Sequence, residues 1–491
     1  MKNGSGIYLQ LSSEPPDCSH WIRDRPRSRR RGSNTFMKIF GTNFSLGIVR
    51  MSLVLGVLTL MVSFHLAYVS WLLPVYGYLG FLYPADPGRL TVIGYFLGIV
   101  PAFWMPIALN RPSQFLHWAI YLTIYVPAML VLGFVQLRPD REIITLQIVL
   151  LLGLVTIGLS YQFKLPHLVK PRISPFTFWS LFTLTTLALL GRVVLVYWGN
   201  FQFVSWKEAY DIRYSGSDIA TAAGLAYPIN WLSFVFLPVV MAVGLLSRRP
   251  WLFVLAVAGS VLLFATQGMK HILFSGPYLV VMFLLLRRKP ETFGLRFVWG
   301  NALLLFVFAL YVTIFDAAWS GPAMLIGANF VLRIFGNNGL LMAAYQNFFA
   351  AHAPTYYSHV TGVNWLVSYP YEHPLGIEVS LAAGAAAGSD TFNNQNAGFW
   401  PTDGLGAIGL PGVIVISLLI ALVFYCLDSV STAHKTSLAA LFLSQYVLIL
   451  INVSFFTSLI TGGLVFFFLI FYFMPAHRVN QAKPLPSVVH S

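Results

Sequence analysis

Three basic side chains are the first candidates for chemistry in this chain: Arg213, Lys270 and Arg333. They stand in the stretches WKEAYDIRY, QGMKH and NFVLRIFG. Arginine binds phosphate oxygens through a planar fork, and such charge-assisted hydrogen bonds are the strong ones. Three cations converging on one cavity would suit a pyrophosphate, and they would stabilise the negative charge that develops on a departing phosphate.

Each of these cations also has a plain structural interpretation. Lys270 lies where two short apolar segments meet, and a lysine at a helix end can extend its amine to the lipid headgroups. Arg333 can pair with an acidic side chain of its own loop, and Arg213 with Asp211 or Asp218. The sequence leaves the functional and the structural interpretation open for all three.

A second group of candidates consists of histidines and tyrosines, and its members are His352, His359, His373, Tyr345, Tyr356, Tyr357 and Tyr371. A histidine titrates near neutral pH, so it can take a proton from a sugar hydroxyl. The three histidines are seven and fourteen residues apart, which fits no tight zinc pattern, and we expect no metal. Taken alone, each histidine is more often a hydrogen-bonded structural residue than a catalyst.

A third group lies in the turn-rich segment DTFNNQNAGFWPTDGLGAIG, which contains Asn396, Trp400 and Asp403. Amides and an indole suit sugar recognition, whereas the alternative is a turn whose asparagines satisfy its own backbone. The chain has no Walker loop, HExxH or GxSxG pattern, so nucleotide-driven transport and serine hydrolysis have no support.

The composition shows that membrane helices must position these residues. Hydrophobic residues make up 57% of the 491, charged residues 9%, and the mean hydropathy is +0.73. The two cysteines cannot form a disulfide framework. We predict an all-α, polytopic bundle of about twelve spans. They are expected near 47–69, 90–109, 114–137, 143–161, 176–198, 228–247, 251–267, 271–286, 297–315, 409–427, 437–457 and 459–474.

The distribution of basic residues predicts the topology. With a basic cytoplasmic tail at 1–45, a transmembrane domain at 46–474 and a cytoplasmic tail at 475–491, strict alternation places 22 of the 30 Lys and Arg residues inside. This follows the positive-inside rule, so the net charge of +14 is topogenic, and no nucleic acid is expected as a partner. The basic tail could also contact anionic lipid headgroups. Two substantial loops, 199–227 and 316–408, then lie outside, and chemistry is expected on that face.

The motifs YDIR, GMK, VLRIFGNNGLLMAAYQNFF, YYSH and NNQNAGFWPTDGLGAIGLPG occur in this order over roughly 205–412. Their set and order resemble bacterial O-antigen polymerases, also called oligosaccharide repeat unit polymerases. The resemblance implies a GT-C-like enzyme of the bacterial inner membrane that needs no metal or nucleotide cofactor. It would polymerise oligosaccharide repeat units carried on undecaprenyl pyrophosphate, at the periplasmic face. A flippase and a chain-length regulator would be its partners.

The resemblance also implies roles for single residues. Arg213, Lys270 and Arg333 would bind the pyrophosphate. His359 would be the catalytic base, with Tyr345 and Tyr356 near it, and the segment with Asn396, Trp400 and Asp403 would face the acceptor sugar.

Other functions stay open at this point. An O-antigen ligase would need the same donor site, whereas a lipid-linked oligosaccharide flippase would need a cationic cavity accessible from both sides. A glycosyltransferase that uses polyprenyl monophosphate sugars would usually show acidic residues in the first outer connection, which here has only Asp86.

Overall fold

The computed structural model describes residues 35–85, 88–166, 168–203, 211–360, 363–387, 395, 398 and 400–475. Side chains are described from residue 47 onward, except at 211, 213–215 and 385–387. The chain is 77% helical and has no strand in these ranges, which confirms the all-α prediction.

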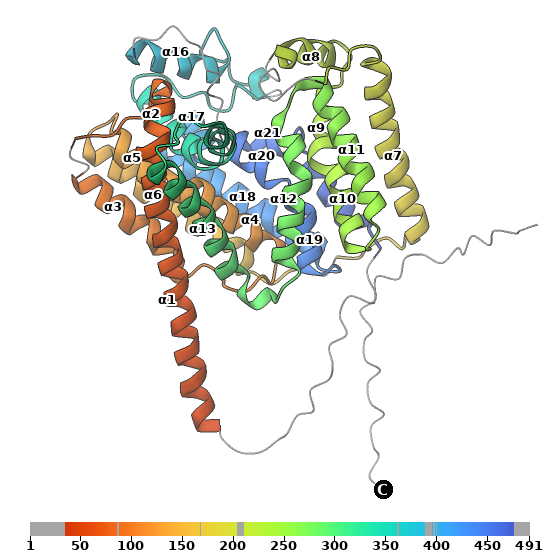
Figure 1. The fold of residues 1–491 in the computed structure, drawn as a ribbon, viewed down its shortest axis with the longest axis horizontal. Helices are drawn as coiled ribbons and strands as arrows, with labels where there is room; N and C mark the ends of the chain where they lie inside the picture. Colours follow the sequence, from red (N-terminus) through yellow and green to blue (C-terminus); the bar gives the residue numbers. More distant parts are fainter. Residues whose placement is uncertain are drawn as a thin grey trace, which may run out of the picture.

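Helices of very different lengths make up the bundle (Figure 1). In chain order they are α1 (Thr35–Ala67), η2 (Tyr68–Leu72), α2 (Leu73–Tyr76), η3 (Gly77–Leu79), α3 (Gly88–Ile99), η4 (Val100–Phe103), α4 (Pro112–Ile120), η5 (Tyr121–Tyr125), α5 (Val126–Val135), α6 (Asp140–Gly158), η6 (Leu159–Tyr161), α7 (Pro175–Val196), α8 (Asp211–Ala222), α9 (Ala226–Trp231), η8 (Leu232–Phe236), α10 (Leu237–Leu246), α11 (Pro250–Gln267), α12 (Lys270–Leu286), η9 (Pro290–Thr292), α13 (Phe293–Ile314), α14 (Gly321–Ile326), η10 (Gly327–Gly336), α15 (Asn337–Phe349), η11 (Val363–Trp365), α16 (Leu375–Ala387), α17 (Pro401–Ile408), α18 (Leu410–Ser431), α19 (Thr436–Leu443), α20 (Val447–Asn452), α21 (Phe455–Leu459) and α22 (Leu464–Phe473).

Nine helices within the described ranges are long and apolar enough to cross a membrane. They are Gly47–Leu79, Pro112–Val135, Asp140–Tyr161, Pro175–Val196, Ala226–Leu246, Pro250–Gln267, Pro290–Ile314, Leu410–Ser431 and Phe455–Phe473. The other three predicted spans fall on shorter helices. The first corresponds to Gly88–Phe103, the second to Lys270–Leu286, and the third to the pair α19 and α20. The polytopic character is therefore confirmed, whereas the count of twelve stays a prediction.

One end of the bundle gathers short basic connections. Arg111 donates a hydrogen bond to the carbonyl of Phe163 (3.0 Å), and Lys170 donates to the carbonyls of Val430 (2.5 Å) and Phe471 (2.7 Å). These bonds join the connection before α4 to the one between α6 and α7, and the latter to the last turns of α18 and α22. We call this end the basic end; it lies opposite α8 and α16 (Figure 1).

The central helix of the bundle is the continuous run α4–η5–α5, Pro112–Val135. The 18-residue apolar core of this run is 100% buried inside the protein, whereas the corresponding part of Pro175–Val196 at the periphery is 17% buried. Helices α3, α15 and α18 pack around it. Tyr121 and Tyr125 donate hydrogen bonds from their hydroxyls to the carbonyls of Gly98 and Leu97 in α3, both at 2.9 Å. These two buried hydroxyls are thereby paired with the backbone of a neighbouring helix.

The predicted outer loop 316–408 is largely helical, and its first part enters the bundle. Helices α14, η10 and α15 form one continuous run, in which Asn338 donates to the carbonyl of Thr123 in the central helix (3.3 Å). A Cβ at Gly327 would lie 2.3 Å from the indole of Trp71, so glycine permits this close approach. Asparagines and glycines lower the hydropathy of this run, which is why the sequence indicated a loop.

A break in a membrane helix separates α19 from α20 at Ser444–Gln445–Tyr446. The hydroxyl of Tyr278 donates to the carbonyl of Ser444 (3.1 Å), which satisfies one backbone group at the break. Gln445 is fully buried, and within the described residues its amide oxygen and its amide nitrogen both have no hydrogen-bond partner. An amide left unpaired in an apolar interior costs free energy.

We expect Gln445→Met to raise the midpoint of thermal unfolding in detergent. The change removes the unpaired amide at similar volume and should stabilise the fold by about 1–3 kcal/mol. Gln147→Met is the control: Gln147 is equally buried and its amide oxygen also has no partner among the described residues, but its amide nitrogen donates to the carbonyl of Met129 (2.9 Å). The control should lower the midpoint. A Gln445→Met protein that loses as much stability as the control would contradict this account.

Candidate active site

The segment before residue 360 is held against α17 by backbone hydrogen bonds. The amide of Thr355 donates to the carbonyl of Gly406, and the amide of Tyr356 donates to that of Ala407, both at 2.9 Å. Tyr356 and Tyr357 have positive φ values of 47° and 62°, which non-glycine residues adopt rarely. These two left-handed residues turn the chain sharply, and His359 follows directly after the turn.

Asp403 lies in the first turn of α17, just after a second unusual backbone conformation. Trp400 precedes the helix with φ 72°, and Pro401 occupies the first helical position. Asp403 is buried. Its Oδ2 accepts a hydrogen bond from the amide of Phe455 (2.9 Å), the first residue of α21. The carboxyl group thereby joins α17 to α21.

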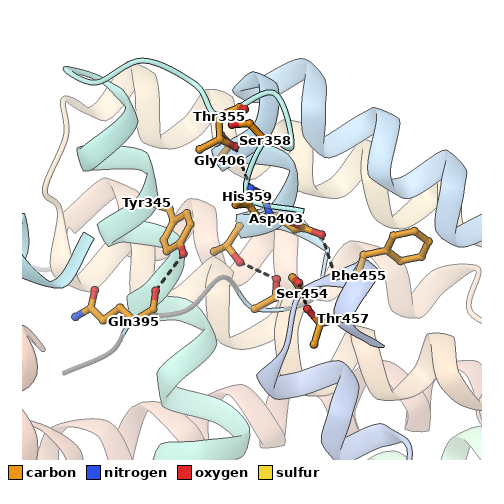
Figure 2. Close-up of polar contacts among 12 residues, drawn as sticks. Tyr345, Thr355, Ser358, His359, Gln395, Asp403, Gly406, Ser454, Phe455 and Thr457 are labelled. Atoms are coloured by element: carbon orange, nitrogen blue, oxygen red, sulfur yellow. Dashed lines mark hydrogen bonds and ion pairs between the residues drawn. The ribbon is translucent and has the colours of Figure 1, made fainter. Parts of the chain in front are cut away.

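His359 and Asp403 approach each other in this turn (Figure 2). The distance from His359 Nε2 to Asp403 Oδ1 is 3.8 Å, and the side chains are 21% and 0% exposed. The other ring nitrogen, Nδ1, lies 3.2 Å from Thr355 Oγ1, which in turn contacts the carbonyl of Gly406 (2.9 Å). A chain of polar contacts thus runs from α17 through Thr355 and His359 and returns to α17.

Three buried polar atoms at this pair have no hydrogen-bond partner among the described residues: His359 Nε2, Asp403 Oδ1 and the Tyr357 hydroxyl. The ring of Tyr357 lies 6.0 Å from that of His359. The hydroxyl of Tyr345 donates to the backbone carbonyl of Gln395 (3.0 Å; Figure 2). Buried polar groups in folded proteins are normally paired, so such a group of unpaired atoms indicates a site for water or a polar ligand.

The two tyrosines near the pair are hydrogen-bond donors at neutral pH. Burial, followed by the charge of Asp403, raises the pKa of Tyr345 well above its ordinary value. The same two causes, in the same order, raise the pKa of Tyr357. Both phenols therefore keep their protons, and neither serves as a base at neutral pH.

Comparison with known proteins does not identify the function of this site. No protein-family profile, curated protein or solved structure gives a significant match. The resemblance to O-antigen polymerases therefore remains a prediction, and the chemistry is argued from the site.

The three predicted phosphate-binding cations lie in three different elements. Arg213 belongs to α8, whose Gly216 packs against the carbonyl of Thr266 near the end of α11, although the Arg213 side chain lies outside the described residues. Lys270 is the half-buried first residue of α12, directly after that end. Arg333 is exposed on η10. The convergence of the three charges on one cavity stays a prediction.

The remaining predicted residues differ in accessibility. Trp400 is fully buried, and its indole donates to Ser417 Oγ (2.6 Å), so the ring packs inside the bundle. Tyr345 is also fully buried, whereas Tyr356 is exposed. Asn396 lies outside the described residues. In the described ranges, no group of three or more His, Cys, Asp or Glu residues could hold a metal ion.

Sequence reasoning missed Thr355 as part of the site and named Tyr357 as a candidate without giving it a role. His352 and His373 are exposed, and His352 Nδ1 donates to the carbonyl of Phe348 (2.8 Å) rather than contacting the site. The sequence signal for Thr355 was its position four residues before His359. This spacing indicates a contact only when the turn at Tyr356 and Tyr357 is known. The left-handed conformation of these two tyrosines cannot be predicted from their residue type.

Proposed function

We propose that this chain is a membrane glycosyltransferase that polymerises oligosaccharide repeat units carried on undecaprenyl pyrophosphate. The observation that carries the proposal is the approach of the partly exposed His359 to the buried Asp403, 3.8 Å apart, with unpaired polar atoms at the pair among the described residues. A base of this kind is what activation of a sugar hydroxyl requires. A GT-C-like architecture and a twelve-span topology belong to the same proposal.

The position of the pair supports a periplasmic site. α17 and α21, which hold Asp403, lie toward the end that carries α8 and α16, away from the basic end (Figure 1). Short basic connections are retained in the cytoplasm, so the basic end is assigned to the cytoplasmic face of the bacterial inner membrane. Both termini would then be cytoplasmic. The repeat units would arrive through a flippase, and a chain-length regulator would act on the product.

The proposed reaction moves a glycosyl group and one proton. The acceptor hydroxyl, on a new lipid-linked repeat unit, gives its proton to the His359–Asp403 pair, and its oxygen forms a bond to the anomeric carbon of the growing chain. The bond from that carbon to the pyrophosphate oxygen breaks, and the electron pair leaves with undecaprenyl pyrophosphate. Arg213, Lys270 and Arg333 would bind this leaving group, because arginine and lysine stabilise developing phosphate charge.

A reconstituted assay tests this function. Purified protein in lipid vesicles, supplied only with undecaprenyl-pyrophosphate-linked repeat units, should produce a ladder of longer lipid-linked chains without nucleotide. A cell that lacks the protein should carry one repeat unit on each lipid A core. Bare core in that cell, with no ladder in vitro, would instead identify a ligase. Movement of the lipid-linked unit across the vesicle without any new glycosidic bond would identify a flippase.

A further inference from the structure

The first turn of α17, which carries Asp403, begins from an unusual backbone conformation. Trp400, the residue before the helix, has φ 72° and ψ −91°, a combination that residues with a side chain adopt rarely. Such a conformation persists only where the surrounding structure holds it. The carbonyl of Trp400 accepts a hydrogen bond from the amide of Gly404 (3.1 Å), so the helix is built directly on this residue. The direction of α17, and with it the place of the Asp403 carboxyl group, therefore depends on how Trp400 is held.

The side chain of Trp400 is held between two other helices. Its indole nitrogen donates a hydrogen bond to Ser417 Oγ in α18 (2.6 Å), and the same hydroxyl donates to the carbonyl of Val413 one turn earlier (2.6 Å). On the side of α6, a Cβ at Gly153 would lie 2.9 Å from Cζ2 of the indole and 2.8 Å from Ser417 Oγ. The missing side chain at Gly153 is therefore what admits the ring between α6 and α18.

α17 is also pressed directly against α18. A Cβ at Gly412 would lie 2.0 Å from the carbonyl oxygen of Gly404, and a Cβ at Gly404 would lie 2.6 Å from the carbonyl carbon of Gly412. The two helices meet at Gly409, whose φ of 74° glycine adopts without strain. Because their backbones are in contact, α17 has little freedom to slide along α18. A displacement of the Trp400 indole is then passed to the turn that carries Asp403.

We infer that Trp400, seated against Gly153, is the positioning residue for Asp403, and that it sets the approach of the carboxyl group to His359. The indole in this role acts through α17, because it is fully buried and lies away from any bound sugar. The catalytic consequence rests on the proposed function, in which His359 and Asp403 take the proton of the acceptor hydroxyl. The seating of the indole and its effect on the turn do not depend on which reaction the enzyme performs.

A residue that merely fills space would also be sensitive to substitution, so the test needs an equal disturbance elsewhere. Gly56 of α1 provides it, because a Cβ there would lie 2.9 Å from Val298 Cγ1 and 3.1 Å from the indole nitrogen of Trp299. Gly56 and Gly153 are both buried, and each faces an indole and a small side chain of another helix. Gly56 belongs to the packed pair α1 and α13, whereas Gly153 belongs to the seat of Trp400.

Gly153→Ala and Gly56→Ala are compared in the vesicle assay. Both should lower the midpoint of thermal unfolding by similar amounts. Gly153→Ala should also lower the kcat of the folded enzyme about tenfold at unchanged KM, because misplacement of a catalytic group weakens the transition state and not substrate binding. Gly56→Ala should keep the wild-type kcat. Equal kcat values for the two folded variants would show that Trp400 only fills space.

A milder pair of variants covers the case in which Gly153→Ala does not fold. Ser417→Ala removes the acceptor of the indole and adds no atom, and it should lower kcat in the same direction at unchanged KM. Ser429→Ala is its control, because Ser429 is also buried in α18 and its hydroxyl donates only to the carbonyl of Tyr425 among the described residues (2.7 Å). A wild-type kcat in Ser417→Ala would contradict the inference.

Nitrogen NMR of ¹⁵N-histidine-labelled protein gives a readout that needs no activity. The His359 ring signals, assigned through the spectrum of His359→Gln, report the approach of the Asp403 carboxyl group. At one fixed pH these signals should move in Gly153→Ala and stay in place in Gly56→Ala. Unmoved signals in Gly153→Ala would overturn the inference. A wild-type protein that forms no polymer would count against the proposed function, and the NMR comparison would still decide whether Trp400 positions Asp403.

Discussion

Asp403→Asn is expected to lower the rate of polymer formation by about 10²–10⁴-fold, the usual contribution of general acid–base catalysis. The asparagine amide has nearly the shape of the carboxyl group. Its oxygen can accept from the amide of Phe455, and its nitrogen can donate to His359 Nε2, so the fold is retained while the exchangeable proton is lost. The measurement is the initial rate of ladder formation by purified protein, together with the midpoint of thermal unfolding.

Asp428→Asn is the matched control for this change. Asp428 is buried to the same extent as Asp403, but it lies toward the basic end and binds the backbone amide and the hydroxyl of Ser113, at 2.9 and 2.6 Å. Its substitution should lower the stability and leave the rate of the folded fraction unchanged. His359→Ala should reduce the rate as strongly as Asp403→Asn. Wild-type polymerisation by either site variant would show that the base is elsewhere.

Arg333→Ala is expected to lower the polymerisation rate by about 100-fold or more, while the protein still inserts and folds. Arg333 is exposed on η10, so it is available to a bidentate phosphate contact, and a hydrogen bond to a charged group contributes about 1.5–3 kcal/mol. Arg333→Lys should recover part of the rate, since lysine keeps the charge without the fork. The readout is the ladder of chain lengths at saturating and at limiting lipid-linked substrate.

Arg138→Ala controls for the loss of an exposed arginine. Arg138 forms an ion pair with Glu142 (2.8 Å), and exposed pairs of this kind contribute little to stability. This variant should polymerise as the wild type does. Arg213→Ala should match Arg333→Ala if both arginines bind the pyrophosphate. Normal chain-length ladders from both Arg213→Ala and Arg333→Ala would contradict the proposal that these arginines bind the pyrophosphate.

The helical membrane architecture could be predicted from the sequence, but the course of the segment 316–408 could not. Long apolar runs identified the spans because lipid permits little else. The run α14–η10–α15 was not recognised as part of the bundle, because Asn337 and Asn338 make it less apolar. Asn338 is nevertheless buried against the central helix. Burial inside protein allows polar side chains that exposure to lipid would not, and hydropathy cannot distinguish the two surroundings.

The site was predicted as residues but not as an arrangement. His359 and Asp403 were both candidates, in separate roles, because they are 44 positions apart and only the turn at Tyr356 and Tyr357 brings them together. Thr355 joins the site through its contacts with His359 Nδ1 (3.2 Å) and the carbonyl of Gly406 (2.9 Å), which residue type alone does not predict. The arginines and Lys270 were found by their scarcity outside the basic connections, a signal that locates charges but not their mutual distances.

The enclosure of Pro112–Val135 by protein has a consequence for biogenesis. This helix leaves the ribosome long before α15 and α18, which later cover it, have been synthesised. During that interval its tyrosines and histidine must be accommodated by lipid or by the insertion machinery, and the late helices then displace those temporary neighbours. A nascent chain that stops before α18 would leave this helix only partly covered, so its enclosure is completed only when the segment from residue 410 onward has been made.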